Sequence, residues 1–304
     1  MKRICAKIII YLYELINSLY RLLRKHLHIL IALSFCLFTK NACSQKVGLV
    51  LSGGGSSGLS HIGVIKALED NNIRIDYICG ASSGGLIGAF YAIGYSPREI
   101  EKIVNSKIFQ SITKGDIPKK YEYMIKKRND YASWFSYKYD FNTNYIENML
   151  TNLINSIPID YYLMETFSGR CNKSNNNFDS LFVPFRCLAS DIENKKTIVF
   201  KNGSLPSALR AGISYPFYLR PLNIDNKLLF DGGLYNSFPI DVMQKEFRPD
   251  FIIGSNVSEK KQKPDEDNLY LQIRSLLTNQ TDSNSFIKNV ILIEPWTEAT
   301  TFNF

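Results

Sequence analysis

The fold of this chain is set by residues 75–94, which read IDYICGASSGGLIGAFYAIG. A short apolar run leads into the pattern Gly-x-Ser-x-Gly from Gly80 to Gly84, and an apolar, helix-like run follows as far as Gly94. A serine in such a tight strand-to-helix turn is pushed out of the backbone, and glycines flank it because side chains would clash there. The stretch therefore predicts a nucleophile elbow with Ser82 as the candidate nucleophile.

The rest of residues 45–304 alternates short apolar runs with helical stretches, as a parallel sheet covered on both faces requires. We predict one α/β domain, a three-layer α/β/α sandwich with a mainly parallel central sheet. The predicted strands are residues 47–51, 75–79, 184–189, 197–200, 228–230, 251–255 and 290–293. The predicted helices are residues 57–70, 83–93, 97–104, about 145–154, 205–211 and 239–245, and the Asn/Ser-rich stretch 171–177 is predicted to be an exposed loop.

Residues 1–44 differ from the rest in composition. They hold seven of the 36 Lys and Arg residues but only one of the 28 acidic residues, so residues 45–304 are nearly neutral and show no nucleic-acid footprint. An apolar run over 29–38 and small residues before Gln45 predict a signal peptide and an exported protein. The alternative is an uncleaved membrane anchor, because the many Leu and Ile residues of 8–23 could form an amphipathic helix.

Residues 114–141 interrupt the alternation with many aromatic residues among lysines. This composition suits a cap over the substrate site or a surface that meets lipid head groups, and an irregular insertion packed on the sheet fits it equally well. The three cysteines beyond residue 44 have no CxxC spacing, which argues against a disulfide framework and a zinc site. Cys79 and Cys187 lie in apolar runs and are expected to be buried packing residues.

A second glycine-rich turn lies upstream, where an apolar run over 47–51 is followed by Ser-Gly-Gly-Gly-Ser-Ser-Gly and a helical run. The backbone N–H groups of such a loop and the helix N-terminus converge on one point and form an anion site. The spacing of Gly53, Gly55 and Gly58 also fits a dinucleotide-binding fingerprint. That motif needs an acid at the end of the second strand, whereas Asp76 lies at its beginning, so an oxyanion loop is favoured.

A serine nucleophile needs a base, and beyond residue 44 His61 is the only histidine. It lies among apolar residues on the predicted helix after the glycine loop, which favours a packing role or a role supporting the site over catalysis. A serine hydrolase would then need a carboxylate in place of the histidine of a Ser-His-Asp triad. Asp231 is the best candidate, although Asp-Gly between apolar runs is also a favoured hairpin turn. An Asp of ordinary pKa is a weak base, so the pair would depend on a dehydrated pocket and strong oxyanion stabilisation.

Together the three segments resemble the patatin-like phospholipase (PNPLA) family, whose members use a Ser-Asp dyad. The matching pieces are Gly53 to Gly58 with residues 61–64, Gly80 to Gly84, and residues 231–233 with 236, 238 and 239, within a likeness that covers about residues 46–255. The resemblance implies a lipid acyl hydrolase that acts through an acyl-enzyme on phospholipids or other acyl-ester lipids at a membrane surface, without metal or cofactor. It assigns Ser82 as nucleophile, Asp231 as base, the backbone of Gly53, Gly54 and Gly55 as oxyanion hole, and supporting roles to Gly58, Gly80, Gly84, Gly232 and Gly233.

Two positions depart from the family pattern. Ser57 stands where members usually carry Arg or Lys, and Ala81 and Ser83 flank the serine in place of the commoner Thr and Ala. A positive charge that could help orient the loop or a lipid phosphate is absent. Neither departure removes the dyad, but together they leave open the rate and the preference for charged phospholipids over neutral esters. A catalytically weak, secreted lipid-binding protein therefore stays open as an alternative function, together with a dinucleotide-binding domain.

Overall fold

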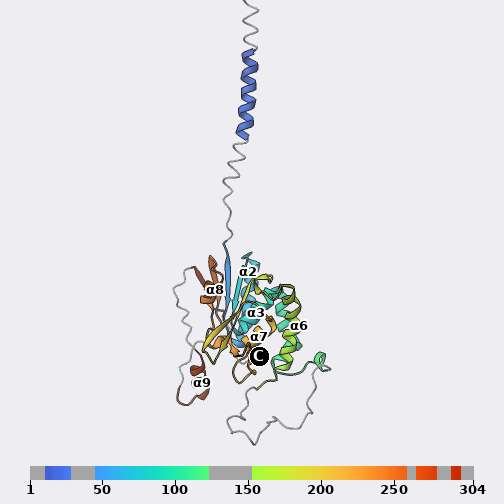
Figure 1. Ribbon diagram of the computed structural model, residues 1–304, viewed down its shortest axis with the longest axis vertical. Coiled ribbons are helices and arrows are strands. Elements are labelled where there is room, and N and C mark those ends of the chain that lie inside the picture. Colours follow the sequence, from blue (N-terminus) through green and yellow to red (C-terminus); the bar gives the residue numbers. More distant parts are fainter. Residues whose placement is uncertain (1–10, 29–44, 123–152, 259–264, 279–288, 296–304) are drawn as a thin grey trace, which may run out of the picture. The chain divides into compact units, whose positions relative to one another are not determined.

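The computed structural model describes residues 11–28, 45–122, 153–258, 265–278 and 289–295 (Figure 1). The chain divides into two units, Met1–Ser44 and Gln45–Phe304. In the first unit, residues 11–28 form a helix whose side chains are almost all exposed. Within the described residues, no helix combines the length and the apolar character that a bilayer crossing requires.

The second unit is built on an eight-stranded sheet. Its strands are β1 (Val47–Leu51), β2 (Tyr77–Gly80), β3 (Phe185–Asp191), β4 (Lys196–Phe200), β5 (Leu222–Ile224), β6 (Lys227–Asp231), β7 (Phe251–Ser255) and β8 (Val290–Ile293). Hydrogen bonding between neighbouring strands gives the sheet order β5-β6-β3-β2-β1-β7-β8, and β4 pairs with β3. The pairings from β3 through β2, β1 and β7 to β8 are parallel, whereas those of β4, β5 and β6 are antiparallel.

Helices cover both faces of this sheet, because side chains alternate between two cores along each central strand. In β1, Leu49 and Leu51 join one core and Val50 joins the other. The first core receives α2 (His61–Asp70), α3 (Ser82–Ala92), α4 (Pro97–Val104), α5 (Lys107–Thr113), α6 (Ile157–Lys173) and α7 (Leu205–Gly212), and the second receives α8 (Ile240–Glu246). Figure 1 shows α2 and α6 on one side of the sheet and α8 on the other, which confirms the predicted three-layer α/β fold.

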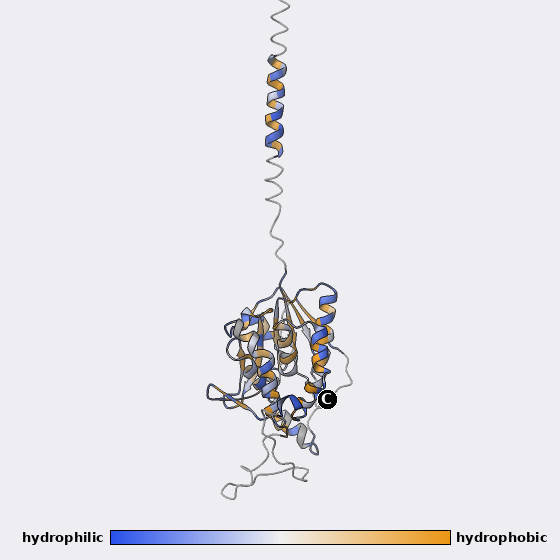
Figure 2. Ribbon diagram, turned by 90° about the vertical axis from the view of Figure 1, so that its right-hand side faces the viewer, coloured by the Kyte–Doolittle hydropathy of each residue, from blue (hydrophilic) through white to orange (hydrophobic). Residues whose placement is uncertain are grey.

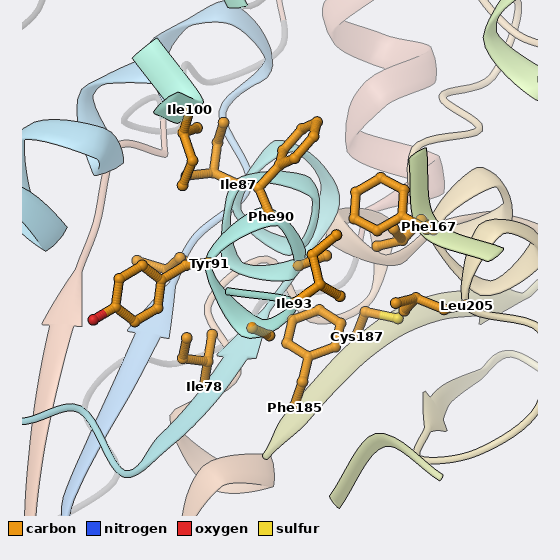
Figure 3. Packing of buried hydrophobic residues seen from close by; sticks show 14 of the residues in the cluster. Ile78, Ile87, Phe90, Tyr91, Ile93, Ile100, Phe167, Phe185, Cys187 and Leu205 are labelled. Carbon is orange, nitrogen blue, oxygen red and sulfur yellow. The ribbon is translucent and has the colours of Figure 1, made fainter. Parts of the chain in front are cut away.

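Helix α3 lies at the centre of the larger core (Figure 3). Phe90 packs against Phe167 of α6 with ring centroids 5.0 Å apart, and Ile87 lies next to Ile100 of α4. A helix that is apolar on all sides is held by packing from every direction. The residue that begins α3, Ser82, is therefore fixed by the core of the protein.

Several predicted elements differ from the structure. The strand β5 and the helices α5, α6 and α9 (Leu269–Leu277) were not predicted, and most of the predicted helix 145–154 lies outside the described residues. The stretch 171–177 was predicted to be an exposed loop, but it begins inside α6, where Cys171 is only 1% exposed. Its carbonyl accepts the N–H groups of Ser174 and Asn176, so the asparagines and serines build a turn that ends the helix.

The predicted insertion 114–141 is described only as far as residue 122. Tyr121 is buried and donates its hydroxyl to Glu165 of α6 at 2.7 Å, and Lys120 forms an ion pair with the same carboxylate. The first residues of this segment thus pack on α6, and the cap expected over residues 123–141 lies outside the described part of the chain.

Candidate active site

Ser82 lies in a sharp turn between β2 and α3. Its φ of +50° falls in the left-handed region that residues with a side chain rarely adopt, so the local backbone is strained. The flanking glycines are required by close approach: a Cβ on Gly80 would lie 2.6 Å from the carbonyl oxygen of Gly84, and a Cβ on Gly84 would lie 2.4 Å from that of Ser52. The predicted elbow geometry is present, for the steric reason that the sequence indicated.

The topology of β3 explains why Asp231 meets this turn. β4 pairs with one edge of β3 along this stretch, so β2 and β6 share the other edge. Gly80 at the end of β2 lies opposite Cys187, and Asp231 at the end of β6 lies opposite Ala189. These two positions of β3 are two residues apart, roughly 7 Å along a strand. The ends of the two strands therefore face each other, with Ser82 just beyond the first.

The side chains of Ser82 and Asp231 form a direct hydrogen bond. The Ser82 hydroxyl donates to Oδ2 of Asp231 at 2.6 Å, and the amide of Gly233 donates to Oδ1 at 2.7 Å. Asp231 is 3% exposed. Burial raises the pKa of Asp231 to about 6, against the two hydrogen bonds that lower it. The carboxylate is thus still ionised at neutral pH, yet more basic than an exposed Asp.

The glycine loop packs directly against the serine. A Cβ on Gly53 would lie only 3.1 Å from Cβ of Ser82. The Gly53 N–H, however, donates to the carbonyl of Ser237 at 2.9 Å, so this amide has a partner already. Within the described part of the chain, no acceptor lies on the amides of Gly54 and Gly55. Two of the three predicted oxyanion donors therefore remain available to a ligand.

The other predicted glycines also fill positions where a side chain would collide. A Cβ on Gly58 would lie 2.2 Å from Oγ of Ser83, and one on Gly232 would lie 2.4 Å from the carbonyl oxygen of Leu188. Gly58 belongs to the short 3₁₀ helix η1 (Gly55–Ser60), in which Ser57 is 3% exposed. The position where relatives usually carry a charge is thus buried in this loop.

His61 is buried and supports the glycine loop through hydrogen bonds, the second of the two roles that the sequence left open. It is fully buried, its Nε2 donates to the carbonyl of Ser52 at 2.9 Å, and its Nδ1 accepts from the Ser255 hydroxyl at 2.8 Å. Burial lowers the pKa of His61 to about 4, so the ring is neutral at physiological pH. The Ser52 hydroxyl in turn accepts the N–H of Val257 at 2.8 Å. These bonds join the start of the glycine loop to the end of β7.

The sequence did not indicate the residues whose hydrogen bonds fix the backbone of Asp231. The Asp231 N–H donates to the carbonyl of Ser214 at 3.0 Å. Arg210, which is 4% exposed, donates to the Ser214 hydroxyl and to the carboxylate of Asp160, both at 2.5 Å, and to the carbonyl of Arg220 at 2.9 Å. No local pattern marks these residues, because their contact arises only when the end of α7 reaches β6.

The remaining candidates have structural partners. Asp76 accepts the N–H of Val47 at 2.9 Å and pairs with Arg74 at 3.0 Å, so it fastens the starts of β1 and β2. Cys79 and Cys187 are buried, as predicted, and burial raises the pKa of the Cys79 thiol. Among the described residues, no group of three His, Cys, Asp or Glu side chains has the arrangement of a metal site.

Comparisons with known proteins confirm the predicted family resemblance. Residues 49–243 match the family model described as patatin-like phospholipase. The patatin-like phospholipase domain-containing protein ZK370.4 of Caenorhabditis elegans is 28% identical over 65% of this chain and 12% of its own length. The neuropathy target esterase sws of Drosophila melanogaster is 29% identical over 66% of this chain and 12% of its own. The lysophospholipase NTE1 of Debaryomyces hansenii is 26% identical over 67% of this chain and 11% of its own length. The match therefore spans a small part of each of these relatives.

Proposed function

This chain belongs to the patatin-like phospholipase family, and on that premise we propose that it hydrolyses acyl esters of lipids with Ser82 as nucleophile and Asp231 as general base. The observation that carries the proposal is the 2.6 Å hydrogen bond from the Ser82 hydroxyl to the Asp231 carboxylate. A nucleophile within hydrogen-bond reach of a base that a third group orients is the arrangement that nucleophilic catalysis needs. Here the Gly233 amide is the orienting group.

The reaction proceeds in two steps through an acyl-enzyme. In the first, Oγ of Ser82 attacks the ester carbonyl carbon while its proton moves to Oδ2 of Asp231, and the leaving alcohol takes that proton as the tetrahedral intermediate collapses. In the second, Asp231 accepts a proton from water as the water attacks the acyl-enzyme. Collapse releases the fatty acid and returns the proton to Ser82. Both steps use the same carboxylate, first as base and then as acid.

The oxyanion of each tetrahedral intermediate rests on backbone amides of the glycine loop. Gly54 and Gly55 supply these donors, because the Gly53 amide is bonded to Ser237. The role of Gly53 is steric: its missing side chain lets the loop approach Ser82. Preorganised donors of this kind commonly provide the largest part of the rate enhancement of acyl transfer. They matter more here because a carboxylate is a weaker base than an imidazole.

The burial of Asp231 adapts it to this work. A general base is most effective when its pKa lies near the working pH, and burial brings the pKa of Asp231 to about 6. The substrate class follows from the relatives, whose names include esterase and lysophospholipase. We infer an acyl ester of a phospholipid or lysophospholipid, with neutral acyl esters as the competing class because the usual cation of the glycine loop is absent.

The test is fatty-acid release from defined diacyl phospholipid, lysophospholipid and monoacylglycerol, measured for wild type, Ser82→Ala and Asp231→Asn. Each variant should lose at least about 10³-fold in kcat. Ser83→Ala is the matched control, since its hydroxyl faces Gly58 and not Asp231, and it should retain activity. A fluorophosphonate probe should label the wild type at Ser82 and leave Ser82→Ala unlabelled. Activity that survives both dyad changes would reject the assignment, and lipid binding without labelling would favour a lipid-binding role.

A further inference from the structure

The helix of residues 11–28 has an apolar face that nothing in the described part of the chain covers. Its large apolar residues are between 51% (Leu12) and 76% (Tyr11) exposed. At roughly 100° per residue, these side chains fill an arc of roughly 200° around the helix. Figure 2 shows apolar and polar residues side by side along its whole length. The members of the apolar face are Tyr11, Leu12, Tyr13, Leu15, Ile16, Leu19, Tyr20, Leu22, Leu23 and Leu27.

The opposite face of this helix is polar and mainly basic. It carries Glu14, Arg21, Arg24 and Lys25 together with Asn17, Ser18 and His28, whereas at the same spacing His26 falls within the apolar arc. Cations thus outnumber the single carboxylate, and they occur together in the second half of the helix. A basic polar face opposite an apolar face with Tyr and Leu is the pattern of a helix that lies in the plane of a membrane surface. Anionic head groups complement the cations, and the tyrosines suit the boundary between head group and acyl chain.

Two other occupants of the apolar face fit less well. A membrane-spanning helix would place Arg21 and Glu14 within the hydrocarbon, at a high cost in free energy, and these residues lie along one side instead of at the ends. A coiled coil with a second copy needs a narrow apolar seam of two positions in seven. The observed arc is far wider than such a seam, and most of it would stay exposed in a dimer.

We propose that residues 11–28 form an in-plane membrane anchor, with the apolar face buried among the acyl chains and Arg21, Arg24 and Lys25 on anionic head groups. The occupant of this face is therefore a lipid surface rich in anionic lipid. This proposal does not rest on the catalytic assignment, because its readout is binding and not hydrolysis. It requires that the segment stays attached to the protein.

The first test is flotation of the full chain with vesicles of phosphatidylcholine alone or with 30% phosphatidylglycerol. Leu19→Asn with Leu23→Asn changes the apolar face without changing the charge, and should lower vesicle partition about tenfold or more. Asn17→Gln with Ser18→Asn is the matched control on the polar face and should bind like the wild type. Replacing Arg21, Arg24 and Lys25 by Gln should remove the preference for anionic vesicles, on the order of tenfold or more.

The second test determines how the helix lies. An environment-sensitive dye is attached to Leu23→Cys or to Arg24→Cys, with Cys5, Cys36 and Cys43 changed to Ser because the other three cysteines are buried. An in-plane helix gives a lipid-like signal at position 23 and an aqueous one at position 24. Lipid-like signals at both neighbours would indicate a spanning helix and overturn the proposal.

Three further outcomes would also overturn it. These are equal binding of the Leu19/Leu23 double variant and the wild type, a dimer that only the apolar-face variant disrupts and that ignores vesicles, and an intact mass of the protein from its host that lacks residues 11–28. Labelling of Ser82 by the fluorophosphonate probe needs no lipid surface, so a failure of the anchor would leave the proposed function standing.

Discussion

Asp231 carries an electrostatic cost in the folded protein, because burial raises its pKa from the ordinary value of 3.8 to about 6. Below about pH 4 the carboxyl is protonated in the folded and the unfolded chain, so the cost is absent. As the pH rises, the unfolded chain loses this proton first, and the stability falls until the folded group ionises near pH 6. Above that pH the cost is complete.

Asp231→Asn should therefore stabilise the protein at neutral pH by about 1–3 kcal/mol, since the buried charge is removed while the side chain keeps its shape. The gain should vanish near pH 4. Thermal unfolding of wild type and variant at pH 4, 5, 6, 7 and 8 measures this gain. Ser83→Ala is the control, because its difference in stability from the wild type should not change with pH. A gain that does not depend on pH would show that Asp231 ionisation is not its cause.

The same titration predicts the acid limb of activity. If Asp231 must be ionised to accept the Ser82 proton, kcat/KM for a water-soluble ester should fall about tenfold per pH unit below about pH 6. Protein stability is checked at each pH by circular dichroism, because protonation of unfolded His61 also lowers stability as the pH falls from about 6.5 towards 4. An acid limb near pH 4 in folded protein would indicate that the carboxylate is not desolvated.

Among the elements, helix α7 positions the end of β6. Arg210 joins Asp160 of α6 to Ser214, and the Ser214 carbonyl holds the Asp231 amide. Arg210 is buried but the side chain of Asp160 is 44% exposed, so loss of Arg210 should cost less than the about 3–5 kcal/mol of a fully buried pair. Movement of Ser214 would also displace the Asp231 carboxylate, so this pair is coupled to the geometry of the proposed dyad.

Arg210→Met should consequently lower kcat about ten- to hundredfold with little change in KM, in addition to its loss of stability. Arg186→Met is the matched control: Arg186 is also 4% exposed and pairs with Asp179 at 2.6 Å and with Glu246 at 3.0 Å, but it braces β3 against α8. Both variants are compared at a temperature where circular dichroism shows them folded. An equal fall in kcat for the two would show that Arg210 acts through general stability alone.

The sequence predicted those strands and helices that are marked by a run or a regular spacing of apolar residues. Strands β1, β7 and β8 were predicted with their observed bounds, because each is a short, mainly apolar run within the parallel part of the sheet. Helix α6 was not predicted although Ile159, Leu163 and Phe167 recur every four residues, because Tyr161, Tyr162 and Met164 place further apolar side chains on its other faces. Strand β5 has three residues and pairs only with β6, so it has no pattern of its own.

For the candidate site, too, the sequence predicted the local features but not the contacts between distant segments. Ser82 and Asp231 each stand in a recognisable turn, and their order in the chain indicated a dyad. The distance between them could not be derived, because it depends on β2 and β6 sharing one edge of β3. Ser237 could not be predicted for the same reason, because its carbonyl accepts a hydrogen bond from the Gly53 N–H, which is far away in the chain. Contacts that form between segments far apart in the chain need the topology.

At the scale of the whole molecule, two units of different chemistry share one chain. Residues 1–44 carry an excess of cations, whereas residues 45–304 are nearly neutral and contain both members of the proposed dyad. The proposed anchor and the proposed catalytic site thus lie in separate units. Their contributions to hydrolysis should be separable by choosing a substrate that is either dissolved or embedded in a membrane.

A chain that begins at Gln45 should keep its kcat/KM for a short, water-soluble ester within about twofold, because both members of the dyad and the core around α3 lie in the second unit. On phospholipid in anionic vesicles the same chain should lose about tenfold or more of its rate, since it no longer concentrates at the lipid surface. Thermal unfolding of both chains controls for stability. Equal vesicle rates for the two chains would place the membrane contact in the second unit, whereas equal losses on both substrates would mean that residues 1–44 support the fold itself.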